Sequence, residues 1–330
     1  MFAASGAATA LDLFTGTTRV AQEFKRGGGV VTACDTASYS EVLARCYIEL
    51  SASDVDVEEL DDALRELAAL PGDPGYFTET FCERSRYLHP SNGARVDAMR
   101  EAIERDYGGS DLYAILLTAL LLAADRVDST TGLQMAYLKE WAPRALRPIE
   151  LRRPELLQGR GSARRADALD AVRCLPSVDL AYLDPPYNQH RYFSNYHVWE
   201  TLVRWDHPDV YGVACKRVDA RSDERRSAFN SRRDMPRALA DVIAALQADI
   251  VVLSYNDESW LTPDELLAMF AGRERVELLS FDSRRYVGAQ IGIHSPDGRR
   301  VGEVSHLRNR ELLVLAGPAA PVDRMVEATR

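Results

Sequence analysis

The residues with the clearest chemical potential are Asp184-Pro185-Pro186-Tyr187, which directly follow an apolar run at 178–183. A short apolar run bounded by a turn signal predicts a buried strand, and α/β sheets bind ligands at the carboxyl ends of their strands. Proline fixes φ and has no N–H group, so the carbonyls of this turn are available as acceptors. The Asp184 carboxylate and the Pro185 carbonyl could accept both N–H groups of an exocyclic amine. Tyr187 could stack on the base that carries the amine. An ordinary strand-to-loop turn is the structural alternative.

A second candidate site lies in the loop DLFTGTT at 12–18, after an apolar run at 10–14. Gly16 allows the backbone to approach a ligand closely at the start of a helix. Asp35 directly follows the next apolar run at 30–34, and an acid at that place can bind ribose hydroxyls in dinucleotide-binding folds. Because the loop has a single glycine, a plain tight turn is the alternative interpretation.

Both candidate sites require a sheet whose strands end at a common edge. Helical spacing at 19–25 between two apolar runs predicts a strand–helix–strand unit, which is typical of a parallel sheet. Further strands are predicted at 178–183, 250–254, 276–281, 289–293 and 311–315. We therefore expect an α/β fold of the Rossmann type.

The residues between the second and third predicted strands favour a mainly helical insertion. Helical patterns occupy 36–50, 94–107 and 111–127, and Leu60, Leu64, Leu67 and Leu70 recur at helical spacing. We therefore divide the chain into three parts. These are 1–50 with the first loop, 51–165 as the helical insertion, and 166–330 with the second candidate site.

Composition excludes several classes of protein. The 330 residues are 46% hydrophobic and 27% charged, which is typical of a globular protein and not of a disordered or collagen-like chain. The most apolar stretch, 114–124, is shorter than the roughly 20 residues that span a bilayer. The five cysteines form no CxxC motif, and His190 and His197 have no third ligand at a metal spacing, so we expect no metal. A cytoplasmic location is expected, because the N-terminus has no basic residue before its apolar stretch.

The net charge of −10 argues against a nucleic-acid partner, but it is an average over the surface. Phosphate binding depends on where the positive charges lie. Arginines dominate the basic residues, and their planar guanidinium groups suit phosphate and guanine edges. Residues 144–165 contain seven arginines and two glutamates, and a second basic stretch occupies 216–237. The candidate phosphate contacts are Lys139, Lys216, Arg217, Arg221, Arg225, Arg226, Arg232 and Arg233. Solvated loops balanced by acids are the alternative for each stretch.

Several segments, in this order along the chain, resemble the N6-adenine-specific DNA methyltransferases. DLFTGTTRVAQEF at 12–24 is similar to their cofactor motif, and TTGLQMAYLKEW at 130–141 to a stretch after their long helix. DLAYLDPPYNQHRYFSNYHVWETL at 179–202 is the most specific match, followed by VLSYNDE at 252–258 and RRYVGAQIGIHSPDGRRVGEVSHLRNRELLVL at 284–315. The resemblance covers about 12–318 and implies a Rossmann-like methyltransferase sheet that uses S-adenosylmethionine.

The resemblance also implies roles for individual residues. The cofactor site would comprise Asp12, Phe14, Thr15, Gly16, Thr17, Asp35, Asp167 and Asp184. Asp184, Pro185, Pro186 and Tyr187 would be catalytic, and Tyr187 and Tyr286 would line the target-base pocket. An ionised Asp184 would accept an amine hydrogen of an adenine that has left the DNA duplex, and N6 would then attack the methyl group directly. Double-stranded DNA is the expected partner, and a cognate restriction endonuclease a possible one.

Two features differ from the family pattern. Thr18 stands where a second glycine is usual, and eleven residues precede Asp12, where the family carries a segment with a glycine–serine–lysine core. One alternative is therefore a catalytically weak DNA-recognition subunit that lacks this segment. Methylation of adenine in RNA, or of cytosine N4, is another alternative, although cytosine enzymes more often carry serine at the position of Asp184.

Overall fold

The computed structural model describes the greater part of the chain. The described residues are 1–186, 192–222, 227–257, 259–284, 293–294, 300–302 and 308–329. They divide into two compact units, each treated separately below. The first unit consists of Met1–Phe14, Ala168–Gln189 and Ser227–Arg330, and the second of Thr15–Asp167 and His190–Arg226.

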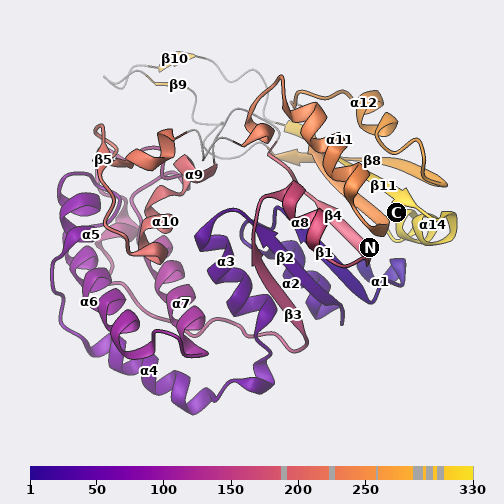
Figure 1. The fold of residues 1–330 in the computed structure, drawn as a ribbon. Coiled ribbons are helices and arrows are strands. Elements are labelled where there is room, and N and C mark those ends of the chain that lie inside the picture. Colours follow the sequence, from indigo (N-terminus) through magenta and orange to yellow (C-terminus); the bar gives the residue numbers. More distant parts are fainter. Residues whose placement is uncertain are drawn as a thin grey trace. The chain divides into compact units, whose positions relative to one another are not determined.

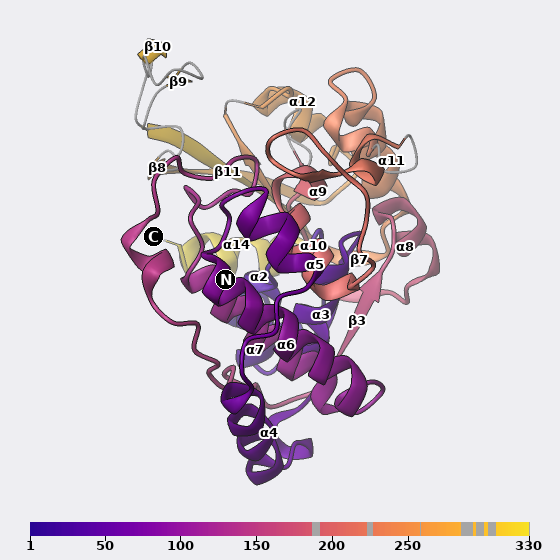
Figure 2. The ribbon, with the colours of Figure 1, turned by 90° about the vertical axis from the view of Figure 1, so that its left-hand side faces the viewer.

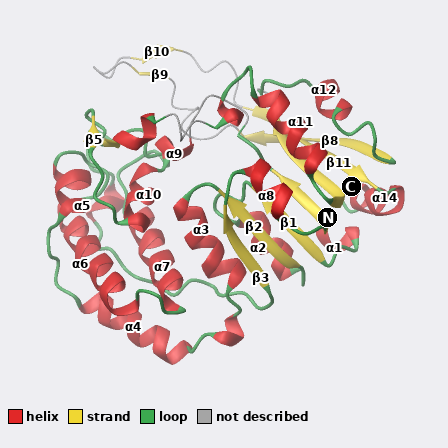
Figure 3. Ribbon diagram, viewed as in Figure 1, coloured by secondary structure: helices red, strands yellow, loops and turns green. Residues whose placement is uncertain are grey.

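The first unit is built on strands in the order β1, β4, β7, β11, β8. Figure 3 draws the strands as yellow arrows and labels β1, β8 and β11 of this unit. Their bounds are Thr9–Leu13 for β1, Val178–Leu183 for β4, Ala248–Asn256 for β7, Arg308–Gly317 for β11 and Arg275–Arg284 for β8. Strands β1, β4 and β7 are parallel, whereas β11 runs antiparallel to both of its neighbours. As a result, β11 begins at the edge of the sheet where the parallel strands end.

Helices cover this sheet, and the parallel strands are accordingly apolar along most of their length. The helices of the first unit are α1 (Phe2–Ser5), α8 (Ala168–Cys174), α11 (Met235–Ala245), α12 (Pro263–Ala268) and α14 (Ala319–Glu327), with a short turn at Ala228–Asn230. Helix α14 packs beside α1 (Figure 1). Arg324 on α14 donates to the carbonyls of Ala4 and Ser5 at 2.9 and 3.1 Å. These bonds hold the two ends of the chain together within the first unit.

The second unit combines a parallel strand pair with helices. Strands β2 (Val30–Asp35) and β3 (Gly161–Arg165) pair in parallel, and β5 (Val210–Tyr211) pairs with β6 (Lys216–Arg217) in antiparallel fashion. Its α-helices are α2 (Arg19–Arg26), α3 (Ser38–Ala44), α4 (Val57–Ala69), α5 (Tyr76–Thr78), α6 (Pro90–Tyr107), α7 (Leu112–Arg126), α9 (Tyr192–Asn195) and α10 (His197–Arg204). Single π-helical turns lie at Arg45–Glu49 and Glu79–Glu83, and short 3₁₀ turns at Ala52–Asp54, Pro143–Leu146 and Val218–Arg221.

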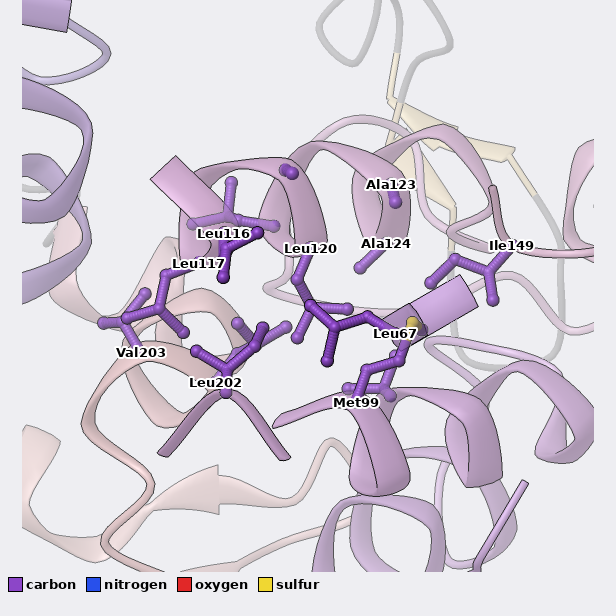
Figure 4. Packing of buried hydrophobic residues seen from close by; sticks show 14 of the residues in the cluster. Leu67, Met99, Leu116, Leu117, Leu120, Ala123, Ala124, Ile149, Leu202 and Val203 are labelled. Carbon is purple, nitrogen blue, oxygen red and sulfur yellow. The ribbon is translucent and has the colours of Figure 1, made fainter. Parts of the chain in front are cut away.

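Helix α7 forms the centre of the second unit's core. It is apolar all round, as expected for a helix with no solvent-facing side. Helices α6 and α7 pack side by side (Figure 2). Leu116, Leu117 and Leu120 of α7 lie among side chains from α4, α6 and α10 (Figure 4). The core of the insertion therefore extends to α10, which follows the Asp184 motif in sequence.

The buried ammonium of Lys25 joins α2 to the π-helical turn Arg45–Glu49. Its Nζ donates to the carbonyls of Tyr47, Ile48 and Leu50 at 3.2, 2.7 and 2.6 Å. These carbonyls lie at a helix end, where no intrahelical donor remains for them. Burial lowers the pKa of Lys25 to about 8. The amine therefore serves as an internal cap that fixes the helix directly after the first candidate loop.

The structure confirms the α/β fold class, and the predicted helical patterns correspond to helices. Helices α2, α6 and α7 match the patterns at 19–25, 94–107 and 111–127, and α3 with the following π-turn matches 36–50. In α4, Leu60, Leu64 and Leu67 share the buried face. The predicted strand at 289–293 lies outside the described residues except for residue 293, which begins β9 (Ile293–His294). Strand β9 pairs with β10 (Arg300–Gly302).

Strand β3 is missing from the sequence prediction, which assigned its residues to a basic connector. Its sequence GSARR has no apolar run, and only Ala163 is buried. Gly161 begins the strand because a Cβ there would lie 2.4 Å from the Ile48 carbonyl oxygen and 2.7 Å from that of Val31. The helical insertion therefore lies between β2 and β3, and the connector ends in a sheet strand.

No helix among the described residues is both long enough and apolar enough to cross a membrane.

Truncating the core helix should reduce stability measurably. Leu120 is fully buried in the α7 cluster, so Leu120→Ala should lower the free energy of unfolding by about 2–5 kcal/mol. Leu146→Ala is the matched control, because Leu146 is 62% exposed and its truncation should cost less than about 0.5 kcal/mol. Urea unfolding followed by circular dichroism measures both values. Equal losses in the two variants would contradict the core described here.

Candidate active site

Asp12 and Asp184 lie at the same edge of the first unit's sheet. The β1–β4 register aligns Asp12 with Tyr182, and Asp184 follows the end of β4 by one residue. Side chains two residues apart along a strand point to the same face, so Asp12, Tyr182 and Asp184 share one face. Asp12 is buried and 1% exposed. The predicted strand at 178–183 is therefore confirmed.

The turn after β4 places its first proline inside the protein. Pro185 is buried and Pro186 is half-buried. Tyr187, the last residue of the motif, lies outside the described residues, as does Tyr286 of the predicted base pocket. The described part of the motif thus consists of an acid and two rigid residues at the carboxyl end of a central strand.

Neighbouring charges and burial shift the protonation of Asp184. Asp184 is exposed to solvent. The surrounding protein nevertheless reduces the hydration of its carboxylate. Desolvation first, and then the negative charges of Asp12 and Glu311, raise the pKa of Asp184 to about 7. The sequence led us to expect an ionised carboxylate. With its pKa raised in this way, Asp184 becomes fully ionised only at a higher pH than an ordinary aspartate.

Phe14 ends the half of the first loop that belongs to the first unit. Its φ of +73° lies in the left-handed region, which a non-glycine residue rarely adopts. The ring packs edge-on against Phe229 with centroids 4.9 Å apart. Sequence reasoning did not identify Phe229, because a lone phenylalanine in a basic stretch gives no periodic signal.

The half of this loop that belongs to the second unit is held by backbone hydrogen bonds. Thr15 N donates to the Cys34 carbonyl at 2.9 Å, and Thr18 N donates to the Thr15 carbonyl at 2.7 Å. Gly16 has a φ of +51° and Thr18 a φ of +63°. Thr18 therefore adopts the left-handed conformation at the position where the sequence lacks the family's second glycine. Thr17 is exposed at the tip of the turn.

Asp35 organises the carboxyl ends of β2 and β3. Its Oδ2 accepts from Gly16 N at 2.9 Å and its Oδ1 from Ala37 N at 3.0 Å. Desolvation raises the pKa of Asp35 although these hydrogen bonds oppose the shift. The Asp35 carbonyl also accepts from Ala166 N at 3.0 Å, directly before the exposed Asp167. Three predicted cofactor residues, Gly16, Asp35 and Asp167, therefore gather within the second unit.

A buried acid that the sequence analysis did not identify caps the N-terminus of α3. Glu200 on α10 is fully buried, and its Oε2 accepts from Ser38 N at 2.9 Å and Tyr39 N at 3.3 Å. A carboxylate suits a helix N-terminus because the first N–H groups have no intrahelical acceptor. The helix that follows Asp35 is thus fixed by the helix that follows the DPPY motif.

Hydrogen bonds of Gln134 join the segment 130–141 to α10. Its Oε1 accepts from Val198 N at 3.0 Å and Trp199 N at 3.2 Å, and its carbonyl lies 3.0 Å from His197 Nε2. Burial lowers the pKa of His197 to about 3. His197 is therefore neutral and buried near neutral pH.

Comparison with known proteins decides the family. Residues 1–269 match the family described as D12 class N6 adenine-specific DNA methyltransferase. The chain belongs to this family. The match includes both candidate loops, the helical insertion and the Asp184 motif. The protein is accordingly a site-specific DNA adenine methyltransferase.

Named relatives support the same assignment. Type II methyltransferase M.NlaIII of Neisseria lactamica is 30% identical over 285 residues, which cover 83% of each chain. Type II methyltransferase M.CviAII of Paramecium bursaria Chlorella virus 1 is 26% identical over 284 residues, again 83% of each chain. Modification methylase LlaI of Lactococcus lactis subsp. lactis is 29% identical over 318 residues, which cover 90% of this chain and 50% of LlaI. No solved structure matches the chain.

The methyltransferase does not present Arg217 to DNA, contrary to the sequence prediction. Its side chain is 1% exposed, and its two terminal nitrogens bond Asp206 at 2.7 Å each. Asp219 accepts from the same guanidinium at 2.8 and 3.0 Å. Asp206 precedes Arg217 by eleven residues and lies outside the basic stretch 216–237, so the charge pattern of that stretch did not show the pairing. The prediction for Arg217 is therefore wrong.

The other predicted phosphate contacts of the methyltransferase fall into three groups. Lys139 and Arg221 are exposed in the second unit, where Lys216 is half-buried. The Arg221 guanidinium lies 3.5 Å from the centroid of the Tyr211 ring. Arg232 and Arg233 are exposed in the first unit, where Arg233 pairs with Asp234 at 2.8 Å. Arg225 and Arg226 lie outside the described residues.

Much of the positive charge at 144–165 is neutralised within the second unit. Arg144 pairs with Asp128, and Arg153 pairs with Asp61 at 3.0 Å. Arg152 pairs with Glu150 at 3.1 Å. The solvated, acid-balanced alternative therefore describes this stretch better than a phosphate-binding strip.

Replacing Arg217 should affect folding rather than DNA affinity. Arg217→Met removes the buried cation of a cluster in which Arg204 still pairs with Asp206 and Asp219 at 2.7 and 3.2 Å, and it should lower the free energy of unfolding by about 1–3 kcal/mol. The exposed Arg221→Met is the control, with an expected loss below about 1 kcal/mol. Urea unfolding measures both. A stable Arg217→Met protein that binds DNA with a reduced salt dependence would restore the phosphate-contact prediction.

Proposed function

We propose that the enzyme transfers a methyl group from S-adenosylmethionine to N6 of an adenine that has been extruded from double-stranded DNA. The observation that carries this proposal is the position of Asp184 and Pro185. They follow the central strand β4 at its carboxyl end, on the sheet face that also carries Asp12. An adenine amine inside the base stack cannot be approached along the line of its lone pair, so the base must leave the duplex first.

The residues around the first loop fit the proposed cofactor. Asp35 holds the Gly16 turn at the end of β2, where a carboxylate can also accept from ribose hydroxyls. The left-handed backbone at Phe14 and Gly16 turns the chain sharply at the strand end, and buried Asp12 supplies negative charge there. A sulfonium cation with an ammonium group is complementary to such acids. When bound, the cofactor supplies an electrophilic methyl group. Asp167, Thr15 and Thr17 complete the proposed site.

Asp184 and Pro185 act on the target amine. In the proposed step, the ionised Asp184 carboxylate and the Pro185 carbonyl accept the two N6 hydrogens. These hydrogen bonds favour charge that develops on nitrogen as the new N–C bond forms. The carboxylate, with a pKa of about 7, can take the proton that N6 loses and return it to water. Pro185 and Pro186 keep the carbonyls of the turn in place, because their φ angles are fixed. Tyr187 stacks on the base, and Tyr286 lines its pocket.

The target-recognition surface is proposed to lie in the insertion 51–165. Phosphate contacts are proposed for the remaining exposed cations, including Lys139, Arg221, Arg232 and Arg233, together with Lys216, Arg225 and Arg226. The relatives named above are type II modification methylases, so we also propose that a cognate restriction endonuclease accompanies this enzyme.

Removing the negative charge of Asp184 should strongly slow catalysis without loss of DNA binding. Asp184→Asn keeps the size of the side chain but replaces an anionic acceptor, so single-turnover methyl transfer should fall by at least about 10²-fold. Transfer of tritiated methyl groups to DNA measures the rate, and fluorescence anisotropy measures DNA affinity. Asp282→Asn, the same change at an exposed position on β8, serves as the control. Wild-type turnover by Asp184→Asn would end the proposed mechanism.

Removing a phosphate contact should reduce the salt dependence of DNA binding. For Arg232→Gln or Arg221→Gln, the slope of log affinity against log salt should become shallower by about one unit. Arg65→Gln is the control, because Arg65 is an exposed arginine on α4 that pairs with Asp62 and belongs to neither basic stretch. Anisotropy titrations between low and moderate salt give the slopes. Slopes equal to wild type in both variants would exclude these two arginines from the interface.

A further inference from the structure

Glu311 lies on the same sheet face as the proposed catalytic acid. Strand β7 pairs Leu253 with Leu183 of β4 and with Val314 of β11, so the position of Asp184 corresponds to that of Leu313. Glu311 is two residues from Leu313 and points to the same side. Because β11 is antiparallel, its first paired residues reach the edge where β4 ends. Two strand spacings, about 10 Å of backbone separation, lie between β4 and β11.

A buried amide fixes the Glu311 carboxylate in this position. Asn256 at the end of β7 pairs with Glu311 in the register, and its Nδ2 donates to Glu311 Oε1 at 3.0 Å. Asn256 is 3% exposed, so the bond is protected from competition by water. The negative charge is therefore held at a defined place on the sheet rather than on a freely rotating side chain.

The charged groups that act on Asp184 are both negative, and the nearby titratable Tyr182 is neutral. Asp12 on β1 and Glu311 on β11 both disfavour its ionised form. Tyr182, two residues earlier on β4, is uncharged near neutral pH, because desolvation together with Asp184, Asp12 and Glu311 raises its pKa. The named groups that shift Asp184 within the described residues are both acids, so like charges on β1 and β11 act on it together.

We propose that Glu311 is a positioning residue that acts through Asp184, and that its fixed negative charge moves the acidic limit of methyl transfer toward neutral pH. The inference rests on the proposed role of Asp184 as an ionised acceptor. Protonated Asp184 lacks the negative charge that favours positive charge developing on N6, so the rate falls as pH falls through the pKa of Asp184. Removal of a like charge lowers this pKa and extends activity to more acidic pH.

The test compares pH profiles of wild type, Glu311→Gln and a control. Glutamine keeps a carbonyl oxygen to accept from Asn256 but removes the charge. Glu277→Gln makes the same charge change on the neighbouring strand β8. Glu277 pairs with Leu315, which follows Glu311 by four residues on β11. Single-turnover methyl transfer with saturating enzyme and cofactor is measured from pH 5.5 to 9. Melting temperatures of the three proteins show that each is folded.

Wild type and Glu277→Gln should share an acidic limb near pH 7. In Glu311→Gln this limb should move down by about half to one pH unit, so the rate at pH 6 relative to that at pH 8.5 should rise about two- to fivefold. A folded Glu311→Gln protein with the wild-type limb, or with a uniform loss of rate at all pH values, would overturn the inference while leaving the role of Asp184 intact. Full activity of Asp184→Asn would instead remove the proposed function on which it rests.

Discussion

The raised pKa of Asp184, caused first by desolvation and then by repulsion from Asp12 and Glu311, is the constraint on which the proposed chemistry depends. Asp12, Asp184 and Glu311 come from three different strands and approach one another because each strand begins or ends there. Such an arrangement is costly for folding, because like charges with reduced hydration disfavour each other. The strands can hold it because their apolar side chains are buried along most of their length. The energy of core packing thus maintains an acid whose pKa of about 7 suits an acceptor near neutral pH.

The antiparallel direction of β11 is what makes this arrangement possible. A further parallel strand would present its last residues at the edge, whereas β11 presents its first ones, with Glu311 opposite Asn256. The second unit shows the same use of buried polar groups for a different purpose. Lys25, Glu200 and Gln134 each satisfy backbone groups of a distant segment, and together they fix the elements that follow the first loop and the DPPY motif. In both units, buried polar side chains decide where loops and helix ends lie.

The sequence was sufficient for the fold class and for the central motif, because these depend on local patterns. Apolar runs predicted β1, β2 and β4, and helical spacing predicted α2, α6 and α7. Strand β3 was missed because GSARR is stabilised by pairing with β2 and by the close approach that Gly161 allows, not by apolar side chains of its own. Glu200 and Glu311 were missed because their partners lie far away in sequence, so no spacing rule connects them. Arg217 was misjudged for a related reason, since local charge counting does not show which cations are buried between acids.

The protonation of Asp184 in the free enzyme is the most direct test of this account. Carbon-13 NMR of the enzyme labelled at aspartate carboxyl groups, with the Asp184→Asn protein to assign the signal, follows that single carboxyl through a pH titration. The account predicts a midpoint near pH 7, about three units above that of an ordinary aspartate. A midpoint near 4 would show that neither desolvation nor the acids on β1 and β11 act on Asp184, and would contradict the central claim.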